Sequence, residues 1–234
     1  MKQRTILVTG VGRVGQLGEA VVRAFGAQGA KVIAIVYRHD EAADCLASLR
    51  GEGHDVTAFE CDLTNADEVA RVAAEVGALT GDRLDGLVNV AGGFEMSGPV
   101  RESDPGVWGR MFALNATTAY HATRFFLPML RNAEGSIVYI GSVAALLESS
   151  APEISAYAAS KSAVLKLMRA VAEEERGVVR ANAVAPTTIR TGDMVAMLGE
   201  NAPNTVAREA VADTIAFLMS PEAQAVSGEV LRLQ

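Results

Sequence analysis

The sequence predicts an α/β protein built on a doubly wound, parallel sheet of seven strands in a single domain. Short runs rich in valine and isoleucine alternate with longer helical stretches, which is the pattern of parallel β-α-β units. Most of these runs are apolar throughout, as expected for strands that are covered on both faces. The chain has 234 residues, 50% of them hydrophobic, which is enough for one core without disulfides or metal.

The expected elements follow one another along the whole chain. Strands are predicted at 4–9, 31–37, 55–60, 84–90, 135–141, 178–184 and 229–233. Helices are predicted at 17–28, 40–50, 65–79, 104–131, 155–176 and 206–219. These elements leave no room for a second domain, and ligands of such sheets bind outside the carboxyl ends of the strands. The irregular segments that should gather at that edge are 10–16, 91–103, 142–154 and 185–205.

Composition and charge exclude several classes of protein. Lys and Arg number 21 against 28 Asp and Glu, and the net charge of −7 argues against nucleic-acid binding, which needs a basic face. No stretch approaches the roughly 18 apolar residues of a membrane span. The three histidines are far apart and lack metal-ligand spacing, so no metal site is expected. Two cysteines without a secretory signal predict reduced thiols and a cytoplasmic location.

A glycine-rich turn follows the first strand and opens the first helix. Gly10, Gly12 and Gly15 match the pattern G-x-G-x-x-G, and Gly18 follows within the start of the helix. Glycines let the backbone turn sharply and approach a pyrophosphate, and the helix N-terminus adds free N–H groups and partial positive charge. The turn therefore predicts a dinucleotide phosphate site.

Tyr157 and Lys161 lie four residues apart, so their side chains share one face of the predicted helix 155–176. Tyrosine ordinarily titrates at about 10, and a cation within reach favours the phenolate and lowers that pKa. The pair suits a general acid/base that works near neutral pH. Ser142, which closes the fifth strand, and Asn115, in the long helix 104–131, complete the candidate site.

Together these motifs resemble the short-chain dehydrogenase/reductase family over nearly the whole chain, which implies a Rossmann fold and an NAD(P)-dependent oxidoreductase. Asn115, Ser142, Tyr157 and Lys161 match the family's catalytic tetrad residue by residue. The resemblance implies that the serine polarises a substrate carbonyl and the tyrosine transfers the proton. It also implies that the lysine holds the nicotinamide ribose and that the asparagine positions a water. Ser142 and Tyr157 are slightly further apart than in many relatives, and the intervening loop should absorb the difference.

The resemblance extends to the segments that would hold the cofactor. The family's usual turn is T-G-x-x-x-G-x-G, in which the last glycine follows the first by six residues. Here Gly18 follows Gly10 by eight residues, so the turn is about two residues longer or its third glycine has moved. The run Asn89-Val90-Ala91-Gly92 resembles N-N-A-G. This match implies that Ala91 and Gly92 lie against the cofactor ribose and that Asn89 stabilises the central sheet.

Two further segments resemble the family at the adenine and nicotinamide ends. Asp62, with Leu63 beside it, ends the third strand where relatives place an Asp on the adenine amino group; the alternative is a helix cap. The run from Pro186 through Ile189 to Thr191 looks like P-G-x-x-x-T. This match implies contacts with the nicotinamide carboxamide from backbone groups and the threonine hydroxyl.

The end of the second strand bears on the choice of cofactor. Members that prefer NAD usually carry an Asp there for the ribose 2′-hydroxyl, whereas this chain has Arg38. A guanidinium can pair bidentately with a 2′-phosphate, and Arg13 in the glycine turn is a second candidate. The sequence therefore favours NADP(H), with NAD(H) possible and two solvated surface charges as the alternative interpretation.

The sequence predicts an oxidoreductase that interconverts a small-molecule ketone or aldehyde and an alcohol, and it says little about the substrate. The segment 192–205 is short for a substrate lid, which predicts an open, shallow pocket. The candidate apolar walls of this pocket are Phe94, Met96, Leu146, Leu147, Met194 and Met197. The alternative interpretation of each is ordinary packing in the core or on a helix. The alternatives are a dihydropteridine-reductase-like enzyme, a 3-ketoacyl reductase, and a non-catalytic nucleotide sensor on the same fold.

The helices at 104–131 and 155–176 carry more apolar residues than one buried stripe needs. In relatives the matching helices pair across a two-fold axis, and the resemblance implies a homotetramer with 222 symmetry. A dimer is the fallback, and a monomer whose sheet covers both helices is the alternative.

Overall fold

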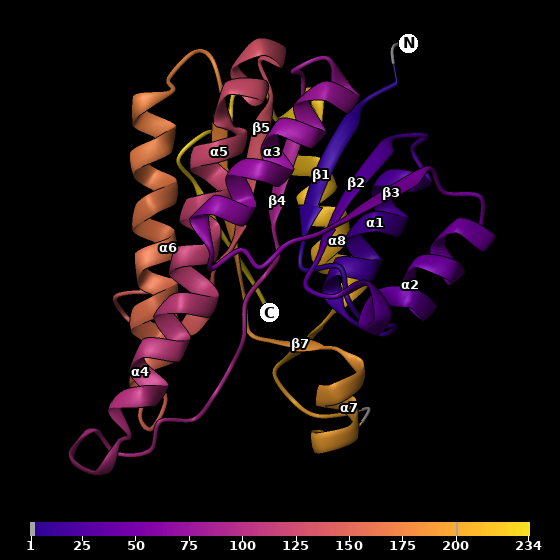
Figure 1. Ribbon diagram of the computed structural model, residues 1–234. Helices are drawn as coiled ribbons and strands as arrows, with labels where there is room; N and C mark the ends of the chain where they lie inside the picture. Colours follow the sequence, from indigo (N-terminus) through magenta and orange to yellow (C-terminus); the bar gives the residue numbers. More distant parts are fainter. Residues whose placement is uncertain (1–2, 200) are drawn as a thin grey trace.

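A parallel sheet with helices on both faces forms the centre of the molecule (Figure 1). This computed structural model describes residues 3–199 and 201–234. The strands of the sheet are β1 (Thr5–Thr9), β2 (Lys31–Val36), β3 (Val56–Glu60), β4 (Gly86–Asn89), β5 (Ser136–Ile140), β6 (Arg180–Pro186) and β9 (Val230–Leu233). Their order is β3-β2-β1-β4-β5-β6-β9. The predicted doubly wound, seven-stranded fold in a single domain is confirmed.

The register at the centre of the sheet joins distant parts of the chain. Ile6 in β1 pairs with Val32 on one side and with Gly86 on the other. Ile6, Leu7 and Val8 are fully buried, because helices cover both faces. Every pairing in this sheet is parallel, so the carboxyl ends of the strands meet at one edge, the lower one in Figure 1.

Two sets of three helices cover the two faces of the sheet. The first set consists of α1 (Leu17–Gly26), α2 (His39–Gly51) and α8 (Arg208–Leu218). The second set consists of α3 (Ala66–Thr80), α5 (Thr118–Ala133) and α6 (Ser155–Glu174). Each set buries its apolar stripe, and Phe25 of α1 and Phe126 of α5 are fully buried. Burial of a side chain of this size contributes roughly 1.5–3 kcal/mol.

Shorter elements complete the fold, several of them at the lower edge in Figure 1. The short helices are α4 (Pro105–Met111), the π-helical η2 (Phe112–Thr117) and α7 (Gly192–Leu198). The 3-10 turns are η1 (Val100–Glu102), η3 (Val143–Ala145) and η4 (Pro221–Ala223). A separate pair of parallel strands is formed by β7 (Thr188–Arg190) and β8 (Thr205–Ala207).

The helix predicted at 104–131 is divided into α4, η2 and α5, which corrects the single helix expected there. The Thr118 hydroxyl donates to the carbonyl of Leu114 at 2.7 Å. This side chain satisfies a carbonyl that an ordinary α-turn would pair with the N–H of Thr118. The wide π-turn holds Asn115 inward, where its exposed fraction is 1%.

Other boundaries shift by a few residues. The helix expected from 206 begins at Arg208, because the residues just before it pair with β7. The strand expected at 84–90 is limited to β4, and the segment 192–205 contains α7 and the first residue of β8. No helix within residues 3–199 and 201–234 combines the length and the hydropathy needed to cross a membrane.

The irregular segments predicted to gather at the carboxyl edge do so. The N–H of Gly192 donates to the carbonyl of Gly15 at 2.9 Å, which joins the segments after β6 and β1. The N–H of Ser97 donates to the carbonyl of Glu153 at 2.8 Å, which joins the segments after β4 and β5. This edge is therefore a continuous surface made of loops from the central strands.

Candidate active site

Tyr157 and Lys161 lie one turn apart on α6, at the carboxyl end of β5. The Lys161 ammonium donates from Nζ to the carbonyl of Ile140, the last residue of β5, at 2.9 Å. Lys161 is 6% exposed, and burial lowers its pKa to about 8 because it penalises the charged form. Lys161 is thus anchored to the sheet by a hydrogen bond and carries an amine that titrates close to neutral pH.

The Tyr157 phenol lies close enough to the Ser142 side chain for that hydroxyl to affect its pKa. Burial raises the pKa of Tyr157, and the nearby Ser142 hydroxyl lowers it in part. The sequence predicted a lowering by the Lys161 cation, whereas in this arrangement the lowering contribution comes from Ser142. The reason is that the lysine amine is turned to the backbone of β5.

Ser142 stands just beyond β5 and caps the short turn η3, where its Oγ accepts from the N–H of Ala144 at 3.2 Å. Its backbone is extended, with φ −159° and ψ 150°, and the residue is 8% exposed. The loop between η3 and α6 spans the longer separation and leaves the Ser142 and Tyr157 side chains close to each other.

Asn115 is held by both ends of its amide in the π-turn η2. Its Oδ1 accepts from the N–H of Gly93 at 3.0 Å, and its Nδ2 donates to the carbonyl of Gly93 at 3.0 Å. Nδ2 also lies 3.1 Å from the Ser160 Oγ, and the Ser160 hydroxyl donates to the carbonyl of Tyr157 at 2.8 Å. Asn115 therefore links the loop after β4 to the helix that carries the tyrosine. Ser160 is a link that sequence reasoning missed, since one serine on a helix carries no distinct signal.

Gly92 brings Asn115 and Lys161 together. A Cβ at this position would lie 2.5 Å from Asn115 Oδ1 and 3.3 Å from Lys161 Nζ, so a side chain here would displace the Asn115 amide. Nearby in β4, Asn89 Nδ2 donates to the Thr123 Oγ1 at 3.3 Å, which ties the strand to α5. The four residues of the predicted tetrad therefore lie in one site, with Asn89 in the sheet-stabilising position expected for it.

The glycine turn has two close backbone approaches. Gly10 has φ +70°, and a Cβ there would meet the Ala91 backbone at 2.7 Å. A Cβ on Gly18 would lie 2.4 Å from the carbonyl oxygen of Gly10, so α1 packs on the turn only because Gly18 is a glycine. Gly12 faces open space, since a Cβ there would have no neighbour within 4 Å among the described residues, and Gly15 has φ +84°.

This turn fits the diphosphate of a nicotinamide dinucleotide. The N-cap residue of α1, Gln16, makes no side-chain hydrogen bond to the helix, so the first N–H groups of this ten-residue helix stay open to an anion. Gly12 adds backbone that a ligand can approach closely. At the far end of the site, the Thr187 Oγ1 is buried and lacks a hydrogen-bond partner among the described residues.

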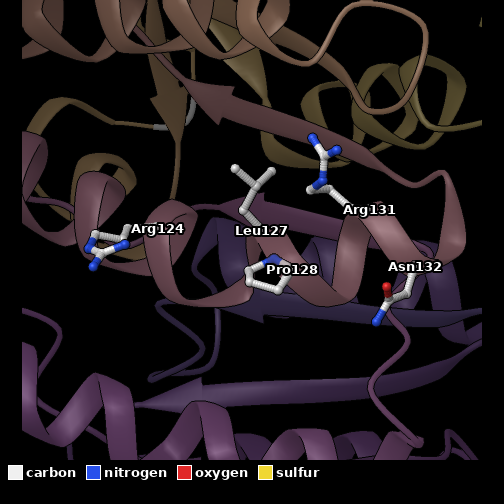
Figure 2. Close-up of a pocket in the computed structure, with 5 residues that line it drawn as sticks. All are labelled: Arg124, Leu127, Pro128, Arg131 and Asn132. Carbon is white, nitrogen blue, oxygen red and sulfur yellow. The ribbon is translucent and has the colours of Figure 1, made fainter.

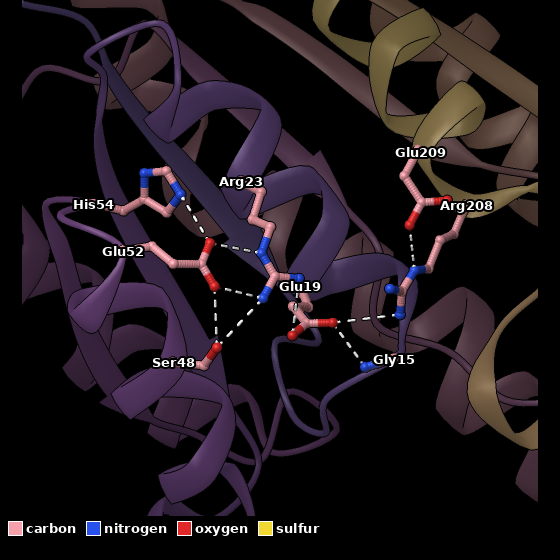
Figure 3. Close-up of polar contacts among 8 residues, drawn as sticks. All are labelled: Gly15, Glu19, Arg23, Ser48, Glu52, His54, Arg208 and Glu209. Atoms are coloured by element: carbon pink, nitrogen blue, oxygen red, sulfur yellow. Dashed lines mark hydrogen bonds and ion pairs between the residues drawn. The ribbon is translucent and has the colours of Figure 1, made fainter.

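Below the turn lies a buried polar cluster that sequence reasoning missed (Figure 3). Glu19 of α1 is fully buried, and its Oε2 accepts from the N–H of Gly15 at 2.7 Å. Arg23 pairs with Glu19 at 3.0 Å, and Arg208 at the start of α8 reaches it at 3.4 Å. The available signal was a single acid in the otherwise apolar first turns of α1. The cluster fixes the shape of the glycine turn from beneath.

Both arginines predicted for a 2′-phosphate are paired with acids. Arg13 binds Asp193 of α7, with 2.7 Å between Nη2 and Oδ2. Arg38, at the N-terminus of α2, lies 3.2 Å from Asp40 and 3.6 Å from Glu41. The Arg38 guanidinium lowers the pKa of Asp40. Both guanidinium groups are more than half exposed, so the structure fits the interpretation as solvated surface charges as well as that of a 2′-phosphate site.

The adenine-side residues make local contacts in this structure. Asp62 Oδ1 accepts from the N–H and the hydroxyl of Thr64, at 2.8 and 2.7 Å. The cap of α3 is neither residue but Asn65, whose side chain accepts from two N–H groups of the first turn. The carbonyl of Leu63 lies 2.9 Å from the His121 Nδ1.

The nicotinamide-side segment runs from β6 into α7. Pro186 ends β6, and Ile189 lies in β7, partly buried against the core. Thr191 is the N-cap of α7, and its Oγ1 accepts from the N–H of Met194 at 3.4 Å. The hydroxyl proton of Thr191 remains able to donate to another group.

The predicted apolar walls are mostly solvent-facing. Phe94 packs edge-on against Tyr157, with ring centroids 5.0 Å apart and an interplanar angle of 79°. Phe94 and Met96 are 53% and 58% exposed, and Leu147 and Met197 are more exposed still. A surface depression elsewhere, on the outer side of α5, is lined by Arg124, Leu127, Pro128, Arg131 and Asn132 (Figure 2). That depression is formed by α5 alone and includes none of the tetrad residues.

Comparisons with known proteins agree with this geometry. The family model described as short chain dehydrogenase matches residues 4–202. The chain is 34% identical over 247 residues to 2-(S)-hydroxypropyl-CoM dehydrogenase 3 of Xanthobacter autotrophicus, covering 97% of this chain and 94% of that protein. A short-chain type dehydrogenase/reductase from Mycobacterium ulcerans has a TM-score of 0.90 at 33% identity, covering 99% of this chain and 88% of that one. A 3-oxoacyl-[acyl-carrier protein] reductase with bound NAD from Brucella melitensis has a TM-score of 0.85 at 28% identity, covering 99% of this chain and 89% of that one.

A parallel sheet of this strand order, with a glycine turn after its first strand, defines a dinucleotide-binding Rossmann fold. The match of the family over most of the chain makes the assignment more specific. This protein belongs to the short-chain dehydrogenase/reductase family, and it is an NAD(P)-binding enzyme.

Proposed function

We propose that the protein is an NADP(H)-dependent oxidoreductase that interconverts a ketone or aldehyde and an alcohol. The proximity of Ser142 to the Tyr157 phenol, one turn from buried Lys161, carries this proposal. A nucleotide sensor would need the glycine turn but no phenol paired with a hydroxyl at the opposite end of the site. The proposed catalytic residues are Asn115, Ser142, Tyr157 and Lys161.

When bound, the nicotinamide supplies or accepts the hydride, and the side chains manage the oxygen and its proton. Ser142 and Tyr157 each carry a hydroxyl that can donate a hydrogen bond to a carbonyl oxygen bound beside them. As negative charge develops on that oxygen, Tyr157 gives it a proton. Loss of that proton leaves a phenolate, and Lys161 stabilises it when its ammonium turns from the Ile140 carbonyl toward the phenol. Asn115 keeps the loop at Gly93 and the helix at Ser160 in place around the tyrosine.

The preference for NADP(H) rests on Arg13 and Arg38, two guanidinium groups near the carboxyl ends of β1 and β2. Their present partners are exposed carboxylates, and a doubly charged phosphate is a stronger partner for a guanidinium. The alternative cofactor is NAD(H), since a related reductase has NAD bound. The remaining proposed contacts are Gly10, Gly12, Gly15 and Gly18 at the phosphates, Asp62 and Leu63 at the adenine, Ala91 and Gly92 at the ribose, and Pro186, Ile189 and Thr191 at the nicotinamide.

We also propose a homotetramer, with the segment 192–205 as the substrate lid. Trp108, Leu114 and Tyr120 are 49%, 41% and 49% exposed along α4, η2 and α5, which is an apolar surplus for a free surface. On α6 the apolar residues are largely buried within the chain, so the interface rests mainly on the first of the two predicted helices. Light scattering tests the assembly, and a mass near 24.5 kDa would contradict it. A cytoplasmic location stays a prediction.

A panel of small ketones and aldehydes, followed by NADPH and NADH absorbance, tests the activity. We expect oxidation of NADPH with at least one carbonyl compound and the reverse reaction with the corresponding alcohol. Loss of turnover with retained cofactor binding in a tetrad variant would tie the activity to this site.

A further inference from the structure

The loop that follows β4 is fastened at both ends. At its start, the N–H and the carbonyl of Gly93 are both bonded to the Asn115 amide at 3.0 Å. At its end, the N–H groups of Ser97 and Gly98 donate to the carbonyl of Glu153 at 2.8 and 2.9 Å, and the Ser97 hydroxyl donates to it at 3.1 Å. We name residues 93–98 the clamped loop.

Glu153 is held in an unusual conformation at the fastening point. Its φ of +63° lies in the left-handed region, which residues other than glycine rarely occupy. Such conformations persist where the surroundings impose them, and they cluster at functional sites. Glu153 lies two residues before α6, so the clamped loop is attached directly to the helix that carries Tyr157.

Phe94 projects from the clamped loop onto the catalytic tyrosine. The two rings meet edge to face, with centroids 5.0 Å apart, which is a favourable geometry for an aromatic pair. Yet Phe94 is 53% exposed, so much of its ring faces solvent beside the phenol. An apolar surface of this kind, next to the atom that would give a proton, is where the body of a substrate has to lie.

The clamped loop and the segment after β5 carry exposed apolar and acidic side chains. Met96 in the clamped loop and Leu147 after β5 are 58% and 102% exposed. Glu148 and Glu153 are exposed on the same segment as Leu147, and neither takes part in an ion pair within residues 3–199 and 201–234. Glu95, beside Phe94, adds a further carboxylate and pairs with Arg110 of α4, with 2.7 Å between Oε1 and Nη2.

We infer that Phe94 is a specificity-determining residue whose ring, held by the clamped loop against Tyr157, selects uncharged, apolar carbonyl compounds over anionic ones. The inference rests on the proposed function, because it names the substrate class of the same site. Ser97 is a positioning residue, since it acts through the placement of Phe94.

Two matched ketone pairs test this inference in the full chain: cyclohexanone with 4-oxocyclohexanecarboxylate, and acetophenone with 4-acetylbenzoate. Steady-state rates with NADPH and NADH give KM and kcat for each compound. We expect the parent to favour the neutral ketone in each pair by about tenfold or more in kcat/KM. In Phe94→Ala the KM for the neutral ketones should rise by about tenfold, the size of a lost apolar contact, while the KM for the carboxylates changes little.

Variants separate specificity from general damage. Phe94→Leu restores an apolar wall and should recover most of the preference, so it also keeps the test decisive if the alanine variant folds poorly. Ser97→Ala should give a ratio between those of the parent and Phe94→Ala. Phe217→Ala removes another half-exposed phenyl ring, on α8, and should leave the ratio at the parent value. A structural defect would instead lower kcat equally for both members of a pair.

The outcomes distinguish the inference from the proposed function. If the parent oxidises neither cofactor with the four ketones or with the panel of small ketones and aldehydes, the proposed function is wrong and this inference falls with it. If the parent is active but prefers the carboxylates, or if Phe94→Ala keeps the parent ratio, the inference alone is overturned.

Discussion

Arg13 in the glycine turn and Asp193 in α7 form an ion pair with 2.7 Å between Nη2 and Oδ2, and both side chains are more than half exposed. Next to this pair, the N–H of Gly192 donates to the carbonyl of Gly15. The proposed lid is therefore joined to the phosphate turn at two points. An exposed pair of this kind is worth about 1 kcal/mol or less, so a 2′-phosphate can displace the carboxylate.

Removing the carboxylate should release Arg13 for the cofactor. Asp193→Asn keeps the side-chain shape and removes the competing charge, so NADPH should bind several-fold more tightly while NADH is little affected. Fluorescence titration of both cofactors at low and high salt measures the effect, which should shrink as salt rises. Equal changes for the two cofactors would mean that Arg13 does not meet the 2′-phosphate.

Arg38 provides the complementary test of cofactor choice. Arg38→Ala should weaken NADPH binding by about tenfold or more, because a charge-assisted contact to the 2′-phosphate is lost, and should leave NADH nearly unchanged. The matched control is Arg169→Ala, an exposed arginine on α6. Equal losses for NADPH and NADH would leave Arg38 as a partner of Asp40 and Glu41 alone.

Tyr157→Phe isolates the proton transfer. The variant removes one oxygen from the site, so NADPH should bind almost as well as in the parent while turnover falls by at least about a hundredfold. Single-turnover absorbance with an established substrate provides the measurement. Normal turnover would show that another group donates the proton.

Gly18 and Gly12 should differ sharply in what they tolerate. Gly18→Ala places a methyl group 2.4 Å from the carbonyl oxygen of Gly10, so α1 must shift, at a cost of roughly 1–3 kcal/mol of unfolding free energy. Gly12→Ala meets nothing within 4 Å among the described residues and should leave the stability unchanged. Urea unfolding of both variants decides the matter. Equal stabilities would show that α1 adapts without strain.

Lys161 should make the stability depend on alkaline pH. Burial lowers its pKa from 10.5 to about 8, so between these values the unfolded chain binds more protons than the folded one. The unfolding free energy therefore gains about 3 kcal/mol from this group as the pH rises through that window, and the gain disappears as the pH falls through 8. Urea unfolding at pH 7 and pH 10.5 should show this rise in the parent and not in Lys161→Met. The exposed Lys166 on the same helix supplies the control, since Lys166→Met should keep the rise.

Much of the fold was predictable because strands that are buried on both faces leave unbroken runs of apolar residues. The helix at 104–131 was predicted as one continuous helix. The π-turn within it depends on the hydrogen bond from the Thr118 hydroxyl to the Leu114 carbonyl, and the spacing of apolar residues carries no information about that bond. The grouping of Asn115, Ser142, Tyr157 and Lys161 was predictable from spacing and from the resemblance to the family, and their catalytic roles stay a prediction. The direction of the Lys161 amine was not predictable, because it depends on the depth of burial and on the carbonyl of Ile140. Glu19, Ser97 and Glu153 also escaped prediction, as their roles arise from tertiary hydrogen bonds.

The register that places Ile6 between Val32 and Gly86 governs how the chain can fold. These partners lie 26 and 80 residues further along the chain. The second pairing therefore requires the entropic cost of closing a long loop before its hydrogen bonds can form. Until β4 arrives, one edge of the apolar β1 is open to strands of other chains. Refolding should therefore be slow, on the order of milliseconds to seconds or longer. Its yield should fall as protein concentration rises, although the finished molecule keeps that edge fully paired.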